Sequence, residues 1–299
     1  MNNNLIKILN NIKIKLKTNT SSEHEAEQQA IWLLEHITQK KYLKLLTQDL
    51  ILNKKQEDSL NKYIKEIITK HKPIQYIIGN INFLNLIIQV KEPILIPRPE
   101  TEEWVDFTIK YLNENLEKYY KNQTIKILDL CTGSGCIALA LAKNIPNSQV
   151  TGIDINPEAI KLANKNKKLN NINNIKFIVS NFYENLENQK FDFIFANPPY
   201  ICESEWQNLD KNVKNWEDKK ALVADSNDCL FAYKNIINNA KNHLNINNIF
   251  TKNKLSQVFL EIGTEQEKII KLLLEEKGLK NIAFRKDLNK TTRLALASI

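Results

Sequence analysis

The sequence predicts an α/β protein with a doubly wound, mostly parallel sheet, preceded by a small helical bundle and a linking β-hairpin. Strand-like and helix-like segments alternate from residue 125 to residue 297, as expected when helices connect parallel strands. Residues 3–72 contain neither proline nor glycine and carry leucine and isoleucine at helical spacing. We therefore expect a helical docking domain at residues 1–73, a hairpin linker at 74–95 and a sheet domain at 96–299.

The helical bundle offers two places where a helix can begin. Residues 20–22 are polar and precede two glutamates, and residues 47–49 form a second polar start. Pro73 ends the bundle, because proline has no N–H to continue a helix. Residues 74–90 then hold two β-rich runs around a polar turn, which predicts a hairpin. Three prolines between residues 93 and 99 stiffen the loop that follows, and such loops often line binding sites.

The sheet domain alternates strands with helices, as a doubly wound fold requires. The expected strands lie at residues 125–130, 150–154, 175–179, 191–196, 257–262, 281–285 and 293–297. The first expected helix begins at residue 100 or 101 and runs through residues 108–116, and the others lie at residues 136–142, 157–163, 228–244 and 265–276. Pro157 suits the first turn of its helix, since the ring fixes φ and no N–H is needed there.

One expected strand, at residues 191–196, stops at two consecutive prolines. Because neither Pro198 nor Pro199 can donate to a neighbouring strand, the chain is forced into a stiff loop past the strand's carboxyl end. Ligands bind at that end in open α/β sheets. The Asn197 carboxamide and the Pro198 carbonyl present two acceptors side by side, which suits a planar amino group with two hydrogens. Tyr200 adds a flat face against which a planar amide or base can stack.

A glycine-containing loop follows the strand at residues 125–130. Gly133 and Gly135 allow a sharp turn and a close approach of a ligand, and the helix after them favours an anionic group. Asp154 lies about twenty residues further on, the spacing of an acid that binds a ribose. The pattern fits both NAD and S-adenosylmethionine. The loop at residues 197–200 favours S-adenosylmethionine, since a methyl donor needs a nitrogen held in line with it and hydride transfer does not.

The composition narrows the partners and the compartment. The chain has 299 residues and a formal net charge of +8, with lysines spread along its length rather than gathered in one cluster. We interpret this charge as solvated surface and expect no stable nucleic-acid binding. No apolar run is long enough to span a bilayer, and residues 1–20 lack the features of a secretory signal. The four cysteines form no Cys-x-x-Cys pair, so we expect reduced thiols in the cytoplasm and no metal site.

Several segments together resemble the HemK/PrmC family of peptide chain release factor glutamine N5-methyltransferases. The segments that carry this resemblance are residues 73–79, 96–102, 129–138, 197–200, 261–263 and 285–288. The run Asp129-Leu130-Cys131-Thr132-Gly133-Ser134-Gly135 looks like the first motif of class I methyltransferases, and Asn197-Pro198-Pro199-Tyr200 looks like their amino-methylating motif. The resemblance implies a class I methyltransferase (Rossmann-like) fold and covers nearly the whole chain.

The family resemblance also implies roles for individual residues. The cofactor is S-adenosylmethionine, and the substrate is the glutamine of the Gly-Gly-Gln loop in class I release factors. The residues expected to hold the methionine part of the cofactor are Cys131, Thr132, Gly133, Ser134 and Gly135. Asp154 is expected to take the ribose, and Phe182 lies where the family contacts the adenine. The residues expected to hold the substrate glutamine are Asn197, Pro198, Pro199 and Tyr200; of these, Asn197, Pro198 and Tyr200 form the catalytic group, and Asn197 also borders the cofactor.

The chain departs from the family pattern at several positions. Cys131 stands where glycine is usual, Asn181 where an acid is common, and Asp218 where proline is common. Residues 245–254 lack an expected Gly-Gly turn. These departures concern stability and rate more than identity.

Three other functions compete with release factor methylation. The nearest is an amino-methyltransferase acting on a base of DNA or RNA, because a base also presents a planar amino group. An NAD-dependent enzyme and a non-catalytic cofactor-binding scaffold are the other two. The small, mixed-charge helical domain favours a protein substrate over a nucleic acid. We expect a monomer without membrane association.

Overall fold

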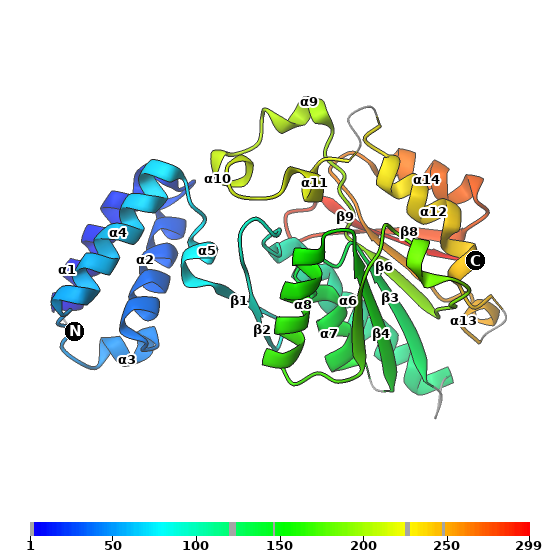
Figure 1. Ribbon diagram of the computed structural model, residues 1–299, viewed down its shortest axis with the longest axis horizontal. Coiled ribbons are helices and arrows are strands. Elements are labelled where there is room, and N and C mark those ends of the chain that lie inside the picture. The colour runs from blue at the N-terminus through cyan, green and yellow to red at the C-terminus, as the bar shows by residue number, and fades with distance from the viewer. Residues whose placement is uncertain (1–2, 120–123, 146, 225–227, 247–248) are drawn as a thin grey trace. The chain divides into compact units, whose positions relative to one another are not determined.

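The computed structural model divides into two compact units (Figure 1). The structure describes residues 3–119, 124–145, 147–224, 228–246 and 249–299. One unit comprises the chain up to Asn80 together with Leu209–Glu217. The other comprises Ile81–Asn208 and Asp218–Ile299. The first unit is helical, and the second holds the sheet.

The helical unit is a bundle around a leucine- and isoleucine-rich core. Its helices are α1 (Asn3–Leu16), α2 (Glu23–Thr38), α3 (Tyr42–Leu46), α4 (Lys54–Lys70), α5 (Ile74–Ile78) and α10 (Lys211–Lys214), with a 3₁₀ turn at Lys17–Asn19. The expected start at residues 20–22 is confirmed, because the Ser22 side chain accepts a hydrogen bond from the Glu25 amide at the beginning of α2. The expected start at residues 47–49 is wrong. Helix α4 begins at Lys54, where Asn53 and Gln56 cap each other in a capping box.

A segment from the middle of the chain completes the helical unit. The indole Nε1 of Trp216 donates to the Lys70 carbonyl at 2.8 Å, and the Lys72 ammonium lies 4.6 Å from the centre of the Trp216 ring. The hydrogen bond satisfies one carbonyl near the end of α4, and the cation–π contact adds to it. The helical unit therefore depends on residues that follow the loop at residues 197–200 in sequence.

The expected hairpin at residues 74–90 is only partly confirmed. Its first apolar run forms the short helix α5, which ends at Gly79 with a left-handed φ of 84°. The hairpin itself consists of β1 (Asn80–Phe83) and β2 (Leu86–Gln89). Glycine ends the helix because it adopts this φ without steric cost, so the run of β-branched residues is closed off as a helix and not as a strand.

The sheet has seven strands in the order β5-β4-β3-β6-β7-β9-β8. The strands are β3 (Ile125–Leu130), β4 (Ser148–Asp154), β5 (Ile175–Val179), β6 (Phe193–Ala196), β7 (Val258–Glu261), β8 (Lys280–Lys286) and β9 (Thr292–Ser298). Strands β3 to β7 are parallel, and β9 pairs antiparallel with both β7 and β8. The chain order reverses at β3, where β4 lies on one side and β6 on the other. The expected doubly wound, mostly parallel fold is confirmed.

Helices cover both faces of the sheet, as Figure 1 shows. The helices of this unit are α6 (Pro99–Tyr119), α7 (Cys136–Asn144), α8 (Pro157–Leu169), α9 (Glu203–Trp206), α11 (Lys219–Leu222), α12 (Phe231–His243), α13 (Ile249–Lys252) and α14 (Glu267–Glu276), with a 3₁₀ turn at Glu184–Leu186. The short helices α9, α11 and α13 were not expected from the sequence. None of the helices in the described part of the chain combines the length and apolarity needed to cross a membrane.

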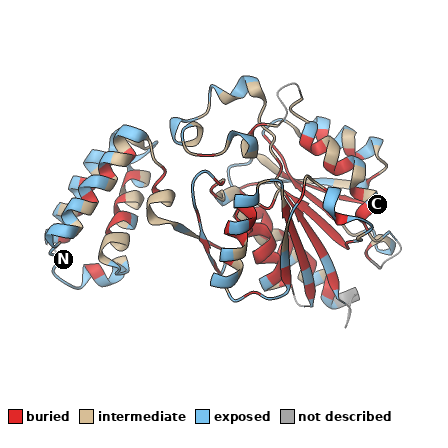
Figure 2. Ribbon diagram, viewed as in Figure 1, coloured by how far each residue is buried: buried red, intermediate tan, exposed pale blue. Residues whose placement is uncertain are grey.

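Two apolar cores lie on opposite faces of the sheet. One packs α6 and α7 against the strands through residues such as Trp104, Phe195 and Phe259. The other packs α12 and α14 through residues such as Tyr233 and Leu260. Figure 2 shows the central strands buried along their length. Burial on both faces explains why these strands are continuous apolar runs and not alternating ones.

The expectation of four reduced cysteines is wrong for two of them. Cys202 and Cys229 form a disulfide, whereas Cys131 and Cys136 are free. The pair is separated by 27 residues in sequence. Because the four cysteines show no spacing motif, nothing in the sequence singled out this pair.

Gly152 allows β4 and β5 to pair closely. A Cβ atom at this position would lie 2.6 Å from two ring atoms of Phe177 and 2.9 Å from Oγ1 of Thr132. We predict that Gly152→Ala lowers the free energy of unfolding by about 1–3 kcal/mol, measured by urea denaturation, because the ring must move. In a Phe177→Leu background the same substitution should cost less. An equal loss in both backgrounds would contradict this packing argument.

Candidate active site

The register of the sheet gathers the expected site residues at one edge. Leu130 pairs with Ile153 on one side and with Ala196 on the other. Asp154 is therefore the last residue of β4 and Asn197 the first residue after β6, the two strands that flank β3 and the glycine-containing loop. Because all of these strands are parallel, their carboxyl ends open on the same side. The structure thus brings the loop at residues 131–135 together with Asp154 and Asn197.

The glycine-containing loop follows a backbone path of left-handed residues. Cys131, Gly133 and Gly135 have φ values of 58°, 54° and 83°. A Cβ atom on Gly135 would lie 2.9 Å from the Phe177 ring and 3.0 Å from the Ala163 Cβ, so this turn also needs the missing side chain. The Cys131 conformation is one that glycine adopts freely and cysteine does not. This explains physically why glycine suits the first loop position better.

Asp129 lies buried at the end of β3, beneath this loop. Its Oδ2 accepts a hydrogen bond from the Thr132 hydroxyl. Its other oxygen, Oδ1, has no hydrogen-bond partner among the described residues, and neither has the buried Ser134 hydroxyl. Burial raises the pKa of Asp129 to about 7, although the Thr132 hydroxyl and the Ala138 amide act in the opposite direction. Unpartnered buried polar atoms are costly, so such atoms in a loop at a sheet edge indicate a ligand site.

Asp154 is half-buried and is held by the backbone. Its Oδ2 accepts from the Gly133 amide at 2.8 Å and its Oδ1 from the Asn156 amide at 2.9 Å. Burial raises the pKa of Asp154, and these two amides partly offset the rise. Each carboxylate oxygen can accept more than one hydrogen bond. The carboxylate is therefore fixed in direction while it retains the capacity to accept from two hydroxyl groups.

Phe182 lies in the loop after β5, at the same edge as Asp154. Its φ of 46° is unusual for a bulky residue. The ring is half-buried and packs edge-on against Phe231, with ring centroids 6.4 Å apart. The Ser180 hydroxyl donates to the Phe182 carbonyl at 3.0 Å and holds the turn. Local strain of this kind is concentrated at functional sites.

The loop after β6 holds Asn197 and Tyr200 by separate contacts. Asn197 is half-buried, and its Nδ2 donates to the Thr101 hydroxyl at 3.4 Å. Pro198 is buried and Pro199 half-buried. The Tyr200 amide donates to the Leu222 carbonyl at 3.1 Å, which ties the loop to α11. The proline pair ends β6 at Ala196, as its chemistry predicts.

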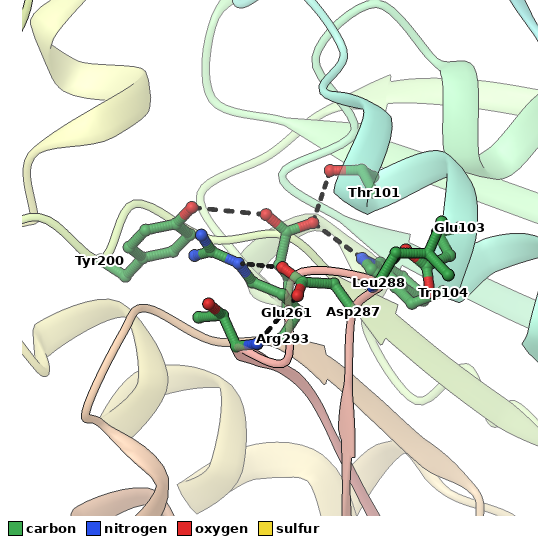
Figure 3. Close-up of polar contacts among 9 residues, drawn as sticks. Thr101, Glu103, Trp104, Tyr200, Glu261, Asp287, Leu288 and Arg293 are labelled. Carbon is green, nitrogen blue, oxygen red and sulfur yellow. Dashed lines mark hydrogen bonds and ion pairs between the residues drawn. The ribbon is translucent and has the colours of Figure 1, made fainter.

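Figure 3 shows a polar cluster that the sequence reasoning missed. Glu261 of β7 is 2% exposed, and its Oε2 accepts from the Thr101 hydroxyl at 2.6 Å and from Nε1 of Trp104 at 2.8 Å. The Tyr200 hydroxyl donates to its Oε1 at 3.4 Å. Burial raises the pKa of Glu261, while these donors and Arg293 lower it. One signal was available: Glu261 is a charged residue in an otherwise apolar strand.

No group of three or more histidine, cysteine, aspartate or glutamate side chains is arranged to hold a metal ion within the described ranges. The polar groups at this edge are instead carboxylates, hydroxyls and a carboxamide. Such groups bind hydroxyl, ammonium and amide groups of organic ligands.

Comparison with known proteins identifies the family. Residues 101–253 match the family model of the methyltransferase small domain, and residues 7–79 match that of the PrmC N-terminal domain. The release factor glutamine methyltransferase of Flavobacterium psychrophilum is 41% identical over 76% of this chain and 75% of its own length. That of Thermodesulfovibrio yellowstonii is 37% identical over 85% of both chains. The chain belongs to the release factor glutamine methyltransferase family. The catalytic domain of hMettl16, with a TM-score of 0.50 and 15% identity over 84% of this chain and 83% of that one, shares the fold alone.

This methyltransferase uses S-adenosylmethionine, and the edge of its sheet fits that cofactor. The unpartnered Asp129 Oδ1 and Ser134 Oγ lie in the loop expected to hold the charged amino acid end of the cofactor. Asp154 retains acceptor capacity for the two hydroxyls of a ribose. The half-buried Phe182 ring offers an apolar surface to a nucleobase.

The buried Asp129 of this methyltransferase predicts a pH dependence of stability. Its pKa is about 7 in the folded chain and about 4 in the unfolded chain, so the folded state binds the proton more tightly. The contribution of Asp129 to stability is therefore full below the unfolded pKa and is lost as the pH rises through the folded value. We predict that the free energy of unfolding of Asp129→Asn minus that of the wild type increases between these two pH values and is constant above the higher one. Urea denaturation over this range measures the difference, and a difference independent of pH would contradict the assignment.

Proposed function

We propose that this enzyme transfers a methyl group from S-adenosylmethionine to the side-chain nitrogen of the glutamine in the Gly-Gly-Gln motif of class I release factors. The observation that carries the proposal is the position of Asn197 at the carboxyl end of β6, next to the strand that leads into the cofactor loop. An amide nitrogen placed at this position would face the Asn197 and Pro198 oxygens on one side and the loop at residues 131–135 on the other. Membership in the release factor glutamine methyltransferase family supports the same substrate.

An amide nitrogen needs positioning, because its lone pair is shared with the carbonyl. On this proposal the Asn197 Oδ1 and the Pro198 carbonyl each accept one N–H of the substrate glutamine. This directs the nitrogen and removes the entropic cost of orienting it during the reaction. The same two acceptors stabilise the positive charge that develops on the nitrogen. Pro198 is buried, its ring fixes its φ and the following Pro199 restricts its ψ, so its carbonyl is held in one direction.

When bound, S-adenosylmethionine supplies an electrophilic methyl group on a sulfonium centre. The residues that would hold it are Cys131, Thr132, Gly133, Ser134, Gly135, Asp154 and Phe182, with Asn197 at the border of the cofactor and substrate sites. Two backbone amides already fix the Asp154 carboxylate.

Tyr200 supports the substrate and does not act as a base. Burial raises the pKa of the Tyr200 hydroxyl, and the nearby Glu261 carboxylate raises it further. The hydroxyl therefore stays protonated at neutral pH and donates to Glu261. Its ring face, beside Pro199, is left to stack on the substrate amide. The proton of the methylated nitrogen can leave after the transfer, so no base is needed in the motif.

We further propose that the helical unit docks the release factor and that the enzyme acts as a monomer in the cytoplasm, without stable nucleic-acid binding. The exposed surface of the bundle includes large apolar side chains, with Leu43 77% and Ile51 80% exposed. Exposed apolar groups suit a protein partner better than a nucleic acid. The cytoplasm is where the proposed substrate acts.

Asn197→Ala tests the positioning role of the carboxamide. We predict that it lowers kcat by about 100-fold, on the order of 3 kcal/mol of transition-state stabilisation, because one acceptor is removed. Steady-state kinetics with S-adenosylmethionine and a release factor measure the effect. Asn238→Ala, at an exposed position on α12, is the matched control and should leave kcat unchanged. Near wild-type turnover by Asn197→Ala would refute the mechanism.

The substrate is tested with radiolabelled S-adenosylmethionine. We expect label on a class I release factor and none when the glutamine of its Gly-Gly-Gln motif is changed to alanine. DNA and RNA oligonucleotides are the competing substrates in parallel reactions. Label on an oligonucleotide and none on the release factor would establish an amino-methyltransferase of nucleic acid instead.

A further inference from the structure

Glu261 is a buried carboxylate whose only part in the mechanism above is to accept a hydrogen bond from the Tyr200 hydroxyl. It lies in the central strand β7 and is 2% exposed. Its donors come from two distant parts of the chain, namely α6 and the catalytic loop (Figure 3). Burying a carboxylate is costly even when it is hydrogen-bonded. Its position beside the catalytic loop calls for a reason other than stability.

The donors around Glu261 fix the direction of one hydrogen bond. An indole N–H can only donate, so the Oε2 atom that faces Trp104 at 2.8 Å must be an acceptor. The Thr101 hydroxyl lies 2.6 Å from the same Oε2 and donates to it, since an Oε2 that carries no proton can only accept. This holds whether or not the other oxygen carries a proton. The single proton of the Thr101 hydroxyl is therefore committed to Glu261.

The committed proton determines which end of the Asn197 carboxamide faces Thr101. With its proton donated to Glu261, the Thr101 oxygen can only accept a hydrogen bond from Asn197. An N–H is the group that can supply it, which agrees with the contact of Nδ2 at 3.4 Å. The carboxamide oxygen is consequently turned away from Thr101. A long contact of this kind can tighten when the substrate binds.

We propose that Glu261 is a positioning residue which, through the Thr101 hydroxyl, selects the orientation of Asn197 that presents Oδ1 to the substrate. This inference rests on the proposed function and adds to it the group that sets the direction of the Asn197 amide. The relay runs from Asn197 Nδ2–H to Thr101 Oγ1 and from the Thr101 O–H to Glu261 Oε2. In the reversed orientation, Nδ2 would face the substrate N–H, so one acceptor would be replaced by a donor.

Thr101→Val tests the relay in methyl transfer. Valine keeps the shape of threonine but has no hydroxyl, so the preference for one amide orientation is lost. We expect kcat to fall at least tenfold with little change in KM for S-adenosylmethionine, and Thr101→Ser to restore most of it. Thr108→Val is the matched control, because Thr108 is also buried on α6 and its hydroxyl donates only to the Trp104 carbonyl. Equal losses in Thr101→Val and Thr108→Val would overturn the relay.

Two further variants test whether Glu261 and Thr101 act through Asn197. Glu261→Ala releases the Thr101 proton and should lower kcat like Thr101→Val, whereas Glu261→Gln still offers an oxygen to both donors and should recover much of the loss. In an Asn197→Ala background, Thr101→Val should have no further effect on kcat. An undiminished effect there would show that Thr101 acts independently, and the proposal would fail.

A spectroscopic measurement tests the relay without turnover. In ¹⁵N-labelled protein the side-chain amide signals of Asn197 are identified by their loss in Asn197→Ala. We expect Thr101→Val to shift these signals and to speed their exchange with water, and Thr101→Ser to leave them near their original positions. Unchanged signals in Thr101→Val would overturn the relay. If the wild type does not methylate a release factor, the proposed function fails, while this measurement still decides on the relay.

Discussion

The site depends on the register between β3 and its two parallel neighbours. Leu130 pairs with both Ile153 and Ala196, so the strand that leads into the glycine-containing loop lies between the strand that ends at Asp154 and the strand that precedes Asn197. A slip of one residue would turn every side chain to the opposite face. Because the strands are buried on both faces, such a slip would disrupt the close packing of both cores, and this opposes it. The distance between the loop at residues 131–135 and the loop at residues 197–200 is thus set by the packing of the core.

The three acids at this edge differ in how their charge is compensated, and this separates their roles. Burial raises the pKa of Asp129, Asp154 and Glu261 alike. Glu261 receives hydrogen bonds from three side chains, which leaves it satisfied within the protein and suited to hold neighbours in place. Asp129 keeps one oxygen unpartnered, which suits a ligand. Asp154 is intermediate: two backbone amides fix its carboxylate, but its oxygens can still accept hydrogen bonds from a ligand.

The sequence was sufficient where a local rule decides the structure. Two prolines must end a strand, so the loop that begins at Asn197 was predictable, and so was the parallel sheet. The prediction of a strand at residues 74–78 was wrong because an apolar run of this length suits a helix or a strand equally. The left-handed conformation of Gly79 ends the run as a helix. Thr101 and Glu261 are 160 residues apart in the sequence. Hydrophobic periodicity predicts local structure and does not predict which distant residues will be in contact. The disulfide between Cys202 and Cys229 was missed because the spacing of the four cysteines matches no motif that would single out this pair.

The chain after the loop at residues 197–200 passes from the sheet unit into the helical unit and back, which constrains how either unit can be changed. The Tyr200 and Ile201 amides both donate to the Leu222 carbonyl, so the intervening segment leaves and returns at the same place. Residues 209–217 of that segment belong to the helical unit, where Trp216 bonds to the end of α4. The helical unit is therefore not a removable N-terminal appendage. Deleting residues 1–80 would remove the Lys70 and Lys72 contacts of Trp216. A bundle of residues 1–80 alone would lack Trp216.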